Sequence, residues 1–308
     1  MAARGTGAPR LSVCIVTWNC RDLVLNCLRT LSEGRNEVSY EVLLVDNASR
    51  DGTVQAVREL HPEVTVVSNE ANVGFAAANN QAIRLARGEY IFLLNPDTVL
   101  PERALDDLVR VADEHPRAGA VGPKLLNPDG TLQYSCRRFP KPWAALFRNT
   151  LFGRLFPHER WTREYLMADW DHNELREVDW VSGAALLLRR EAVEQVGLLD
   201  ERYFWGSEDV DYCRRLEKAG WQVLYTPTPA IVHIIGGSTD RAVLQTIQRR
   251  HASWYRLYSR HFSHCVLDRA VLWLLIWMRG TLLLASWVIQ DLWAKVKAAW
   301  LRALRRHR

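Results

Sequence analysis

Two acidic segments of this 308-residue chain hold the residue types needed for metal–phosphate and acid–base chemistry. Asn95-Pro96-Asp97 follows an apolar run, and Glu208-Asp209 follows the aromatic segment Tyr203–Gly206. A carboxylate at a sheet edge can hold a divalent cation through oxygen, and that cation can bridge a diphosphate. A carboxylate beside an aromatic wall can accept the proton of a sugar hydroxyl. These patterns predict a metal–phosphate site at Asp97 and a general base within the acidic cluster of Glu208, Asp209 and Asp211.

Both segments also have a structural interpretation that needs no ligand. Ser207 could cap a helix that has Glu208, Asp209 and Asp211 in its first turn, where acidic residues favour the helix dipole. The stretch 127–130 repeats the letters Asn-Pro-Asp but ends in glycine, which is typical of a plain turn. The position of each segment in the fold therefore has to decide between the two interpretations.

Two further segments are candidates with weaker signals. His233 lies in the apolar run Ile231–Ile235, where a lone histidine is more often a core residue than a ligand. The Gly236–Thr239 segment that follows could offer backbone N–H groups to a phosphate. Trp180–Ala185 is rich in small residues, which favours close packing of strands.

The elements that must position these residues follow an α/β pattern in the first half of the chain. Continuous apolar runs predict buried strands at Leu11–Thr17, Tyr40–Val45, Val64–Val67 and Tyr90–Leu94. Helical patterns follow these strands in turn, at Asp22–Leu31, Thr53–Leu60, Phe75–Ala86 and Pro101–Glu114. The alternation predicts a Rossmann-like, mostly parallel sheet with helices on both faces.

Ligands of such sheets bind beyond the carboxyl ends of the strands. Polar residues follow all four predicted strands there, namely Thr17–Asn19, Asp46-Asn47, Ser68-Asn69 and Asn95–Asp97. In the second half we expect strands at Thr131–Arg137 and Val178–Leu188, a helix at Ser207–Ala219, and a long irregular excursion over Pro140–Asp171. This arrangement predicts one ligand site along the carboxyl edge of the sheet.

Charge and motif patterns exclude several classes of protein. The net charge of +5 belongs to residues 291–308, and the first 290 residues carry 34 basic and 34 acidic residues. A uniformly basic nucleic-acid binder is therefore excluded, and we expect no nucleic-acid partner. No G-x-G-x-x-G or Walker A motif follows the first strand, which disfavours dinucleotide and P-loop enzymes. The six cysteines show no metal-finger spacing and are expected to be reduced, mostly buried thiols in the cytosol.

The C-terminal region combines apolar, aromatic and basic residues. Ala270–Ile289 is just long enough to span a membrane, but Arg279 near its centre would oppose insertion by about 2.5–3.5 kcal/mol. A helix lying in the membrane interface better suits Trp and Leu followed by Lys and Arg, although a span or an oligomerisation helix remains an alternative. We expect three regions: a flexible N-terminus (1–10), a catalytic domain (11–245) and a helical membrane-associating region (246–308).

Taken in order, these segments resemble the family 2 glycosyltransferases with a GT-A-type fold, and within them the bacterial rhamnosyltransferase-like branch. The resemblance covers about residues 11–240, and no single motif in it is specific. It is carried by Val16–Asn19, Asp46–Thr53, Asn72–Ala76 with Asn79-Asn80, Asn95–Asp97, Trp180–Ala184, Phe204–Asp211 and His233.

The resemblance implies a role for each matching position. Nucleotide-sugar contacts are implied for Thr17, Trp18, Asp46, Asp51, Asn72, Gly74, Asn95 and Gly183. A divalent metal, Mg²⁺ or Mn²⁺, is implied at Asp97 and His233, and the catalytic base at Asp209 with Glu208 beside it. Asn95 stands where the family has the first Asp of its Asp-x-Asp element, so the site carries one charge fewer. The resemblance therefore does not establish strict metal dependence.

The resemblance implies an inverting glycosyltransferase. From the short apolar run Leu11–Val16 near the start of the chain and from the C-terminal region, we expect it in the cytoplasm, peripherally on the inner face of the cell membrane. It would move a sugar from a nucleotide-diphosphate sugar, such as dTDP-rhamnose, to a lipid-linked or polysaccharide acceptor in cell-surface glycan synthesis. Two alternatives stay open: a nucleotidyltransferase, and a non-catalytic nucleotide-sugar-binding module. The first would need a glycine-rich basic loop where the chain has Thr17–Asp22. The oligomeric state is also open.

Overall fold

The computed structural model describes residues 7–140, 160–204, 206–234, 243–263 and 265–306. The chain divides into two compact units. The first unit is Met1–Phe139 with Arg163–Arg241, and the second unit is Pro140–Thr162 with Ala242–Arg308. The domain boundaries expected from the sequence stay predictions.

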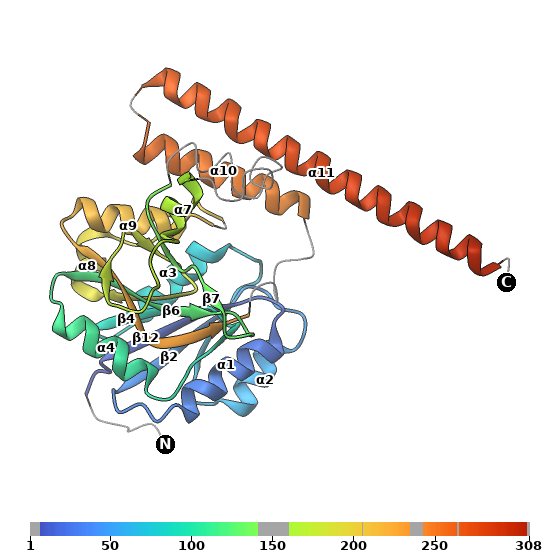
Figure 1. Ribbon diagram of the computed structural model, residues 1–308. Helices are drawn as coiled ribbons and strands as arrows, with labels where there is room; N and C mark the ends of the chain where they lie inside the picture. Colours follow the sequence, from blue (N-terminus) through green and yellow to red (C-terminus); the bar gives the residue numbers. More distant parts are fainter. Residues whose placement is uncertain (1–6, 141–159, 205, 235–242, 264, 307–308) are drawn as a thin grey trace. The chain divides into compact units, whose positions relative to one another are not determined.

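A mixed, mostly parallel sheet forms the centre of the first unit (Figure 1). Its order is β3-β2-β1-β4-β11-β6-β12-β5, with β7 paired to β6 and β9 paired to β12. Its strands are β1 (Leu11–Thr17), β2 (Tyr40–Asp46), β3 (Thr65–Ser68), β4 (Tyr90–Leu94), β5 (Thr98–Val99), β6 (Ala118–Leu126), β7 (Leu132–Gln133), β9 (Arg176–Glu177), β11 (Ala185–Arg189) and β12 (Gln222–His233). The parallel register places Thr17 opposite Asp46, so the ends of β1 and β2 lie side by side.

Helices cover both faces of this sheet, as the sequence pattern predicts. One face carries α1 (Arg21–Glu33), α2 (Thr53–Leu60) and α4 (Ala104–Glu114) (Figure 1). The other face carries α3 (Phe75–Leu85), α8 (Arg190–Val196) and α9 (Glu208–Lys218). The α/β class expected from the sequence is confirmed.

The packing of the core explains why the sequence pattern predicts the strands and helices in the first half of the chain. Every residue of β1 and β4 is buried, because helices cover both faces of these strands. α1 turns Val24, Cys27, Leu28 and Leu31 toward them, at the spacing that its apolar pattern shows. These side chains join one apolar cluster with those of α4 and the central strands.

The sequence pattern does not predict strand β6 (Ala118–Leu126), because its glycines and proline are typical of a turn. The fold needs these glycines for close packing of strands and helices. A Cβ at Gly122 would lie 2.5 Å from Cβ of Val181, and a Cβ at Gly119 would lie 2.8 Å from Cβ of Trp221. Both separations are below any ordinary contact, so a small-residue strand is required there.

The two strands expected in the second half are broken by turns. Thr131–Arg137 holds only β7 and β8 (Cys136–Arg137), and Val178–Leu188 holds β10 (Trp180–Val181) and most of β11. β8 and β10 form a separate two-stranded sheet. The break at residues 182–184 frees the N–H of Gly183 to contact α9. In the expected excursion over Pro140–Asp171, residues 141–159 lie outside the described part, and α7 (Arg160–Leu166) follows them.

Among its described residues, the second unit contains α10 (Val243–His261) and α11 (Val266–Arg306). Tyr258 of α10 packs against Leu272 and Ile276 of α11. Arg279 also faces α10: its guanidinium lies 5.4 Å from the Trp254 ring centroid. Among the described residues, we find no helix with the length and apolar character needed to cross a membrane.

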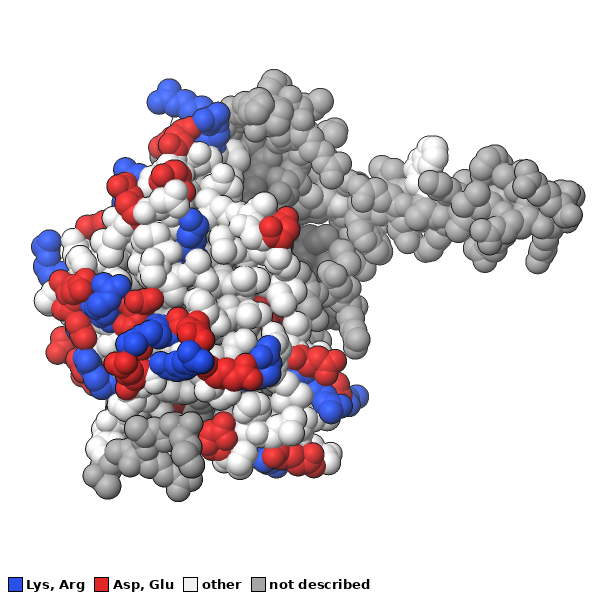
Figure 2. Space-filling model, turned by 60° about the horizontal axis from the view of Figure 1, so that its bottom comes forward, with Lys and Arg blue, Asp and Glu red and all other residues white. Residues whose placement is uncertain are grey.

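Charged side chains of both signs are interspersed on the face drawn in Figure 2. This mixture matches the equal numbers of acidic and basic residues before position 291. All six cysteines are free thiols, and five of them are buried. The expectation of reduced, mostly buried thiols is therefore confirmed.

Candidate active site

The carboxyl ends of β1, β2 and β3 are joined by backbone hydrogen bonds. The N–H of Asn47 donates to the carbonyl of Thr17 at 2.9 Å, and the N–H of Asn69 donates to the carbonyl of Asp46 at 2.8 Å. Thr17 and Asp46 are buried, whereas Trp18 is 39% exposed. Asp46 accepts the Ser49 N–H through Oδ2, while its buried Oδ1 has no hydrogen-bond partner. This edge therefore has a carboxylate oxygen without a hydrogen-bond partner among the described residues, and an exposed ring at the residue that follows β1.

Two other candidate residues hold the loops of this edge in place. Asn72 accepts the N–H of Gly74 at 3.0 Å, and Gly74 has a φ of +91°. A Cβ at Gly74 would lie 2.9 Å from the carbonyl oxygen of Phe204, so glycine is required by both conformation and space. This contact connects the loop before α3 to the loop before α9.

Asp51 caps the N-termini of the two helices that begin next to this edge. Its Oδ2 accepts the N–H of Arg21 at the start of α1, and its Oδ1 accepts the N–H of Thr53 at the start of α2. Partial burial disfavours the charged carboxylate, but the hydrogen bonds from Thr53 and Arg21 outweigh it and lower the pKa of Asp51. The structure thus gives this residue a capping role.

Asp97 and His233 meet at the centre of the carboxyl edge. Nε2 of His233 lies 3.2 Å from Oδ1 of Asp97, and 3.4 Å from Nδ2 of Asn95. In the described part of the chain, the buried Oδ1 of Asp97 has no hydrogen-bond partner. β12 brings the histidine to this place, because His233 pairs with Thr98 of β5. Asn95 and Asp97 therefore share a site with the histidine at the end of a different strand.

Gln133 orients the histidine, although no pattern in the sequence marks this glutamine as a functional residue. Nδ1 of His233 lies 2.7 Å from Oε1 of Gln133, while Nε2 of that glutamine donates to Oδ1 of Asn127 at 3.0 Å. The donation to Asn127 fixes the glutamine oxygen toward the imidazole, which therefore carries its proton on Nδ1. Asn127 belongs to the turn at 127–130, which is the plain turn that the sequence predicts.

This arrangement suits a divalent metal. With its proton on Nδ1, the imidazole turns the lone pair of Nε2 toward Oδ1 of Asp97. Two acceptors facing each other at 3.2 Å leave a position that a cation can occupy, and a hydrogen bond on the distal nitrogen is typical of metal-binding histidines. In the described part of the chain, no three His, Cys, Asp or Glu side chains gather as a metal cluster.

The candidate base lies at the start of α9. Oδ2 of Asp209 accepts the N–H of Gly183 at 3.0 Å, and Oδ1 accepts the N–H of Val210 at 2.8 Å. Burial raises the pKa of Asp209, while these hydrogen bonds and the charge of Arg137 act against the increase. Ala184, which follows Gly183 in the chain, accepts the N–H of Asn95 at 2.8 Å. A single turn therefore connects Asp209 to the Asn95–Asp97 segment.

The surroundings of Glu208 and Asp211 differ from those of Asp209. Glu208 is 6% exposed, and burial together with the charge of Asp209 raises its pKa to about 8. Asp211 is fully buried and forms an ion pair with Arg215 at 2.8 Å. Tyr203, expected in an aromatic wall, is also fully buried and donates to Asp211 at 3.3 Å. Asp211 and Tyr203 therefore stabilise the start of α9, and Trp205 lies outside the described residues.

Comparison with known proteins identifies the class that this fold and site define. The family model "Glycosyl transferase family 2" matches residues 12–197. The N-acetylglucosaminyl-diphospho-decaprenol L-rhamnosyltransferase of Mycobacterium tuberculosis is 37% identical over 71% of this chain and 74% of its own length. The O-antigen biosynthesis protein RfbC of Myxococcus xanthus is 31% identical over 74% of this chain and 17% of its own. The chain belongs to glycosyltransferase family 2, which excludes the nucleotidyltransferase alternative.

Solved structures show the same fold. A mannosyltransferase of Pyrobaculum calidifontis, in complex with GDP-Man and Mn²⁺, aligns with a TM-score of 0.55 at 20% identity, over 93% of this chain and 81% of its own. GalNAc-T7, solved with UDP, GalNAc and Mn²⁺, aligns with a TM-score of 0.59 at 14% identity, over 83% of this chain and 48% of its own. The GT-A-type fold expected from the resemblance is confirmed.

Proposed function

We propose that Asp209 is the base of an inverting sugar transfer whose donor lies along the carboxyl edge of the sheet. The observation that carries the proposal is the turn at residues 183–184, which connects the base to the Asn95–Asp97 segment by two hydrogen bonds. An acceptor hydroxyl is a poor nucleophile, so a positioned carboxylate must take its proton. One base and one direct displacement invert the configuration of the sugar.

Asp97 and His233 would hold a divalent cation against the donor diphosphate, with Asn95 beside them. Such a cation neutralises the charge that grows on the leaving diphosphate. The two solved relatives that contain Mn²⁺ support this assignment. Oδ1 of Asp46 and the exposed ring of Trp18 would contact the nucleotide base, with Thr17 close to them. Asn72, Gly74 and Asp51 would shape the loops around the nucleotide, and Gly183 would lie beneath the donor sugar.

We infer that the donor is dTDP-rhamnose and that the acceptor is a lipid-linked diphosphate sugar used for a cell-surface glycan. The relative from Mycobacterium tuberculosis supports both assignments by its name and by its coverage. The test incubates the full chain and Mn²⁺ with dTDP-rhamnose and an N-acetylglucosamine diphosphate carried on a short isoprenoid. We expect a disaccharide product and dTDP release. Absence of both, across several nucleotide sugars, would contradict the proposal.

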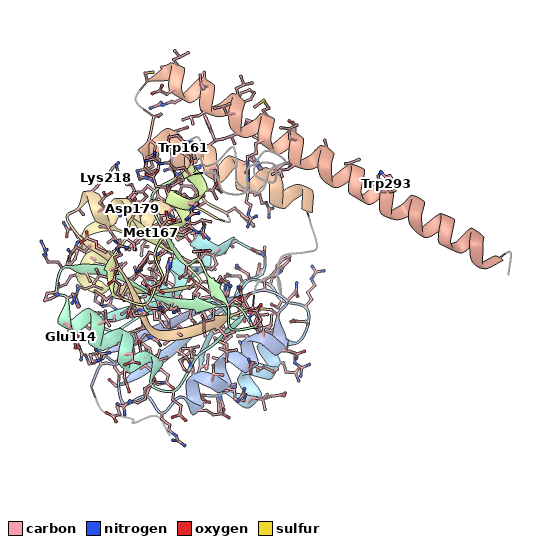
Figure 3. All side chains as sticks on the ribbon, in the orientation of Figure 1. Glu114, Trp161, Met167, Asp179, Lys218 and Trp293 are labelled. Atoms are coloured by element: carbon pink, nitrogen blue, oxygen red, sulfur yellow. The ribbon has the colours of Figure 1, made fainter. Side chains whose placement is uncertain are left out.

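The second unit would hold the enzyme at the cytoplasmic face of an anionic membrane. α11 carries an exposed apolar stripe at helical spacing, formed by Leu267, Val271, Leu274, Met278 and Leu282. Arg279 does not interrupt this stripe, because it faces α10. Trp293, which is 72% exposed and labelled in Figure 3, and the basic residues after position 291 continue the pattern. Apolar and aromatic residues followed by Lys and Arg suit an interfacial helix.

A further inference from the structure

Arg137, the last residue of β8, and Arg138, which follows it, have different surroundings. Arg138 forms an ion pair with Asp179, labelled in Figure 3, at 2.9 Å. Arg137 forms no ion pair with a carboxylate in the described part of the chain, and its Nη2 donates to the carbonyl oxygen of Tyr134 at 2.8 Å. The charge of Arg137 is therefore not neutralised by these neighbours.

Aromatic rings hold the guanidinium of Arg137 in place. Its Cζ lies 5.0 Å from the ring centroid of Trp180 and 5.7 Å from that of Tyr165. Its Nε is buried and has no hydrogen-bond partner among the described residues. Aromatic faces attract a guanidinium and remove water from it, while a cation without a carboxylate partner strongly favours an incoming anion. Arg137 is therefore oriented before any ligand arrives.

The short β8–β10 sheet links Arg137 to the turn that binds the candidate base. Arg137 pairs with Trp180 across β8 and β10, and the chain then reaches Gly183, which donates to Asp209. The two charged groups are close enough to interact: burial raises the pKa of Asp209, and Arg137 is one of the groups that act against the increase. The short β8–β10 sheet thus places a cation that forms no ion pair among the described residues near the base.

We propose that Arg137 is an anion subsite beside Asp209 and binds a phosphate group of a substrate. The inference rests on the proposed function. The donor diphosphate already has Asp97 and His233 on the carboxyl edge, so the diphosphate of the lipid-linked acceptor is the favoured ligand. An arginine can meet a phosphate with two parallel charge-assisted hydrogen bonds, which fix orientation as well as affinity.

The experiment compares two acceptors with the full chain: an N-acetylglucosamine diphosphate on a short isoprenoid, and an uncharged alkyl N-acetylglucosaminide. We expect Arg137→Gln to lower kcat/KM by about 10- to 100-fold on the diphosphate acceptor and by less than about threefold on the uncharged acceptor. Arg137→Lys keeps the charge but not the two parallel N–H donors of the guanidinium. We expect an intermediate loss of kcat/KM on the diphosphate acceptor only. Arg138→Gln is the matched control and should behave like the wild type. If Arg137→Gln does not fold, Arg137→Lys carries the same comparison.

The affinity for dTDP separates the two sources of phosphate. If the Kd of dTDP rises about tenfold in Arg137→Gln, the phosphate is that of the donor and the subsite stands. Equal kcat/KM losses on both acceptors with unchanged dTDP affinity would overturn it, because Arg137 would then act on Asp209 or on the fold alone. Unchanged kinetics on both acceptors would also overturn it. Failure of the wild type to transfer to either acceptor would instead contradict the proposed function.

Discussion

Glu208 and Asp209 are adjacent in sequence, but the fold gives them different environments. Asp209 accepts two backbone N–H groups, whereas Oε2 of Glu208 is buried without a hydrogen-bond partner. Burial and the charge of Asp209 outweigh the backbone hydrogen bonds to Glu208 and raise its pKa to about 8, so Glu208 is mostly protonated at neutral pH and the pair avoids two adjacent charges. This arrangement leaves Asp209 as the carboxylate that can act as a base.

The protonated Glu208 predicts a specific dependence of stability on pH. Its pKa is about 8 in the folded chain and 4.5 as the ordinary value. Between these values the unfolded chain releases a proton that the folded chain keeps, so this contribution to stability is present below pH 4.5 and is lost as the pH rises to about 8. We expect the Tm of Glu208→Gln, relative to the wild type, to increase from pH 5 to pH 8 in thermal melts. A difference that does not change with pH would contradict this assignment.

Gln133 should control metal affinity through His233. Gln133→Leu removes the acceptor for Nδ1–H, and loss of such a partner typically weakens metal binding by about 10- to 100-fold. Titration of Mn²⁺ in the presence of dTDP, followed by electron paramagnetic resonance, measures this change without an activity assay. Gln133→Glu keeps an acceptor and should retain most of the affinity. Wild-type Mn²⁺ affinity in Gln133→Leu would show that the glutamine does not orient a metal ligand.

At the scale of the elements, the packing of β6 predicts a cost for added volume. Gly122→Ala would place a Cβ 2.5 Å from Cβ of Val181, so strand β10 must shift. We expect a loss of about 1–3 kcal/mol in the free energy of unfolding, measured by denaturant titration. Turnover should also fall, because β10 leads into the turn that binds Asp209. A variant as stable and active as the wild type would disprove the close packing.

The elements that the sequence predicts well are those whose pattern is local. A strand buried on both faces appears as a continuous apolar run, so β1 and β4 were predicted with their observed bounds. β6 does not appear as an apolar run, because Gly119, Gly122 and a proline interrupt it. The two glycines are required only by close contacts with residues far away in the sequence. The contact between Gln133 and His233 joins residues 100 positions apart, and no spacing rule in a single sequence marks it.

At the scale of the whole molecule, the charge and the tryptophans of the C-terminal region predict binding to anionic membranes. Replacing Leu274 and Leu282 with Glu in the full chain should lower co-sedimentation with phosphatidylglycerol vesicles by about tenfold or more, since burial of each leucine contributes about 1.5–3 kcal/mol. Leu60→Glu is the matched control, because Leu60 is 64% exposed on α2 of the first unit. Unchanged binding of the double variant would refute the membrane role of the stripe.

The most direct test of the central claim is the turnover of Asp209→Asn with dTDP-rhamnose and the diphosphate acceptor. The substitution keeps the size of the side chain but removes the proton acceptor. We expect turnover to fall by about 10²-fold or more, while the Kd of dTDP stays within about threefold of the wild type. The wild-type product should have the configuration opposite to that of the donor. Near-wild-type turnover of Asp209→Asn would contradict the assignment of Asp209 as the base.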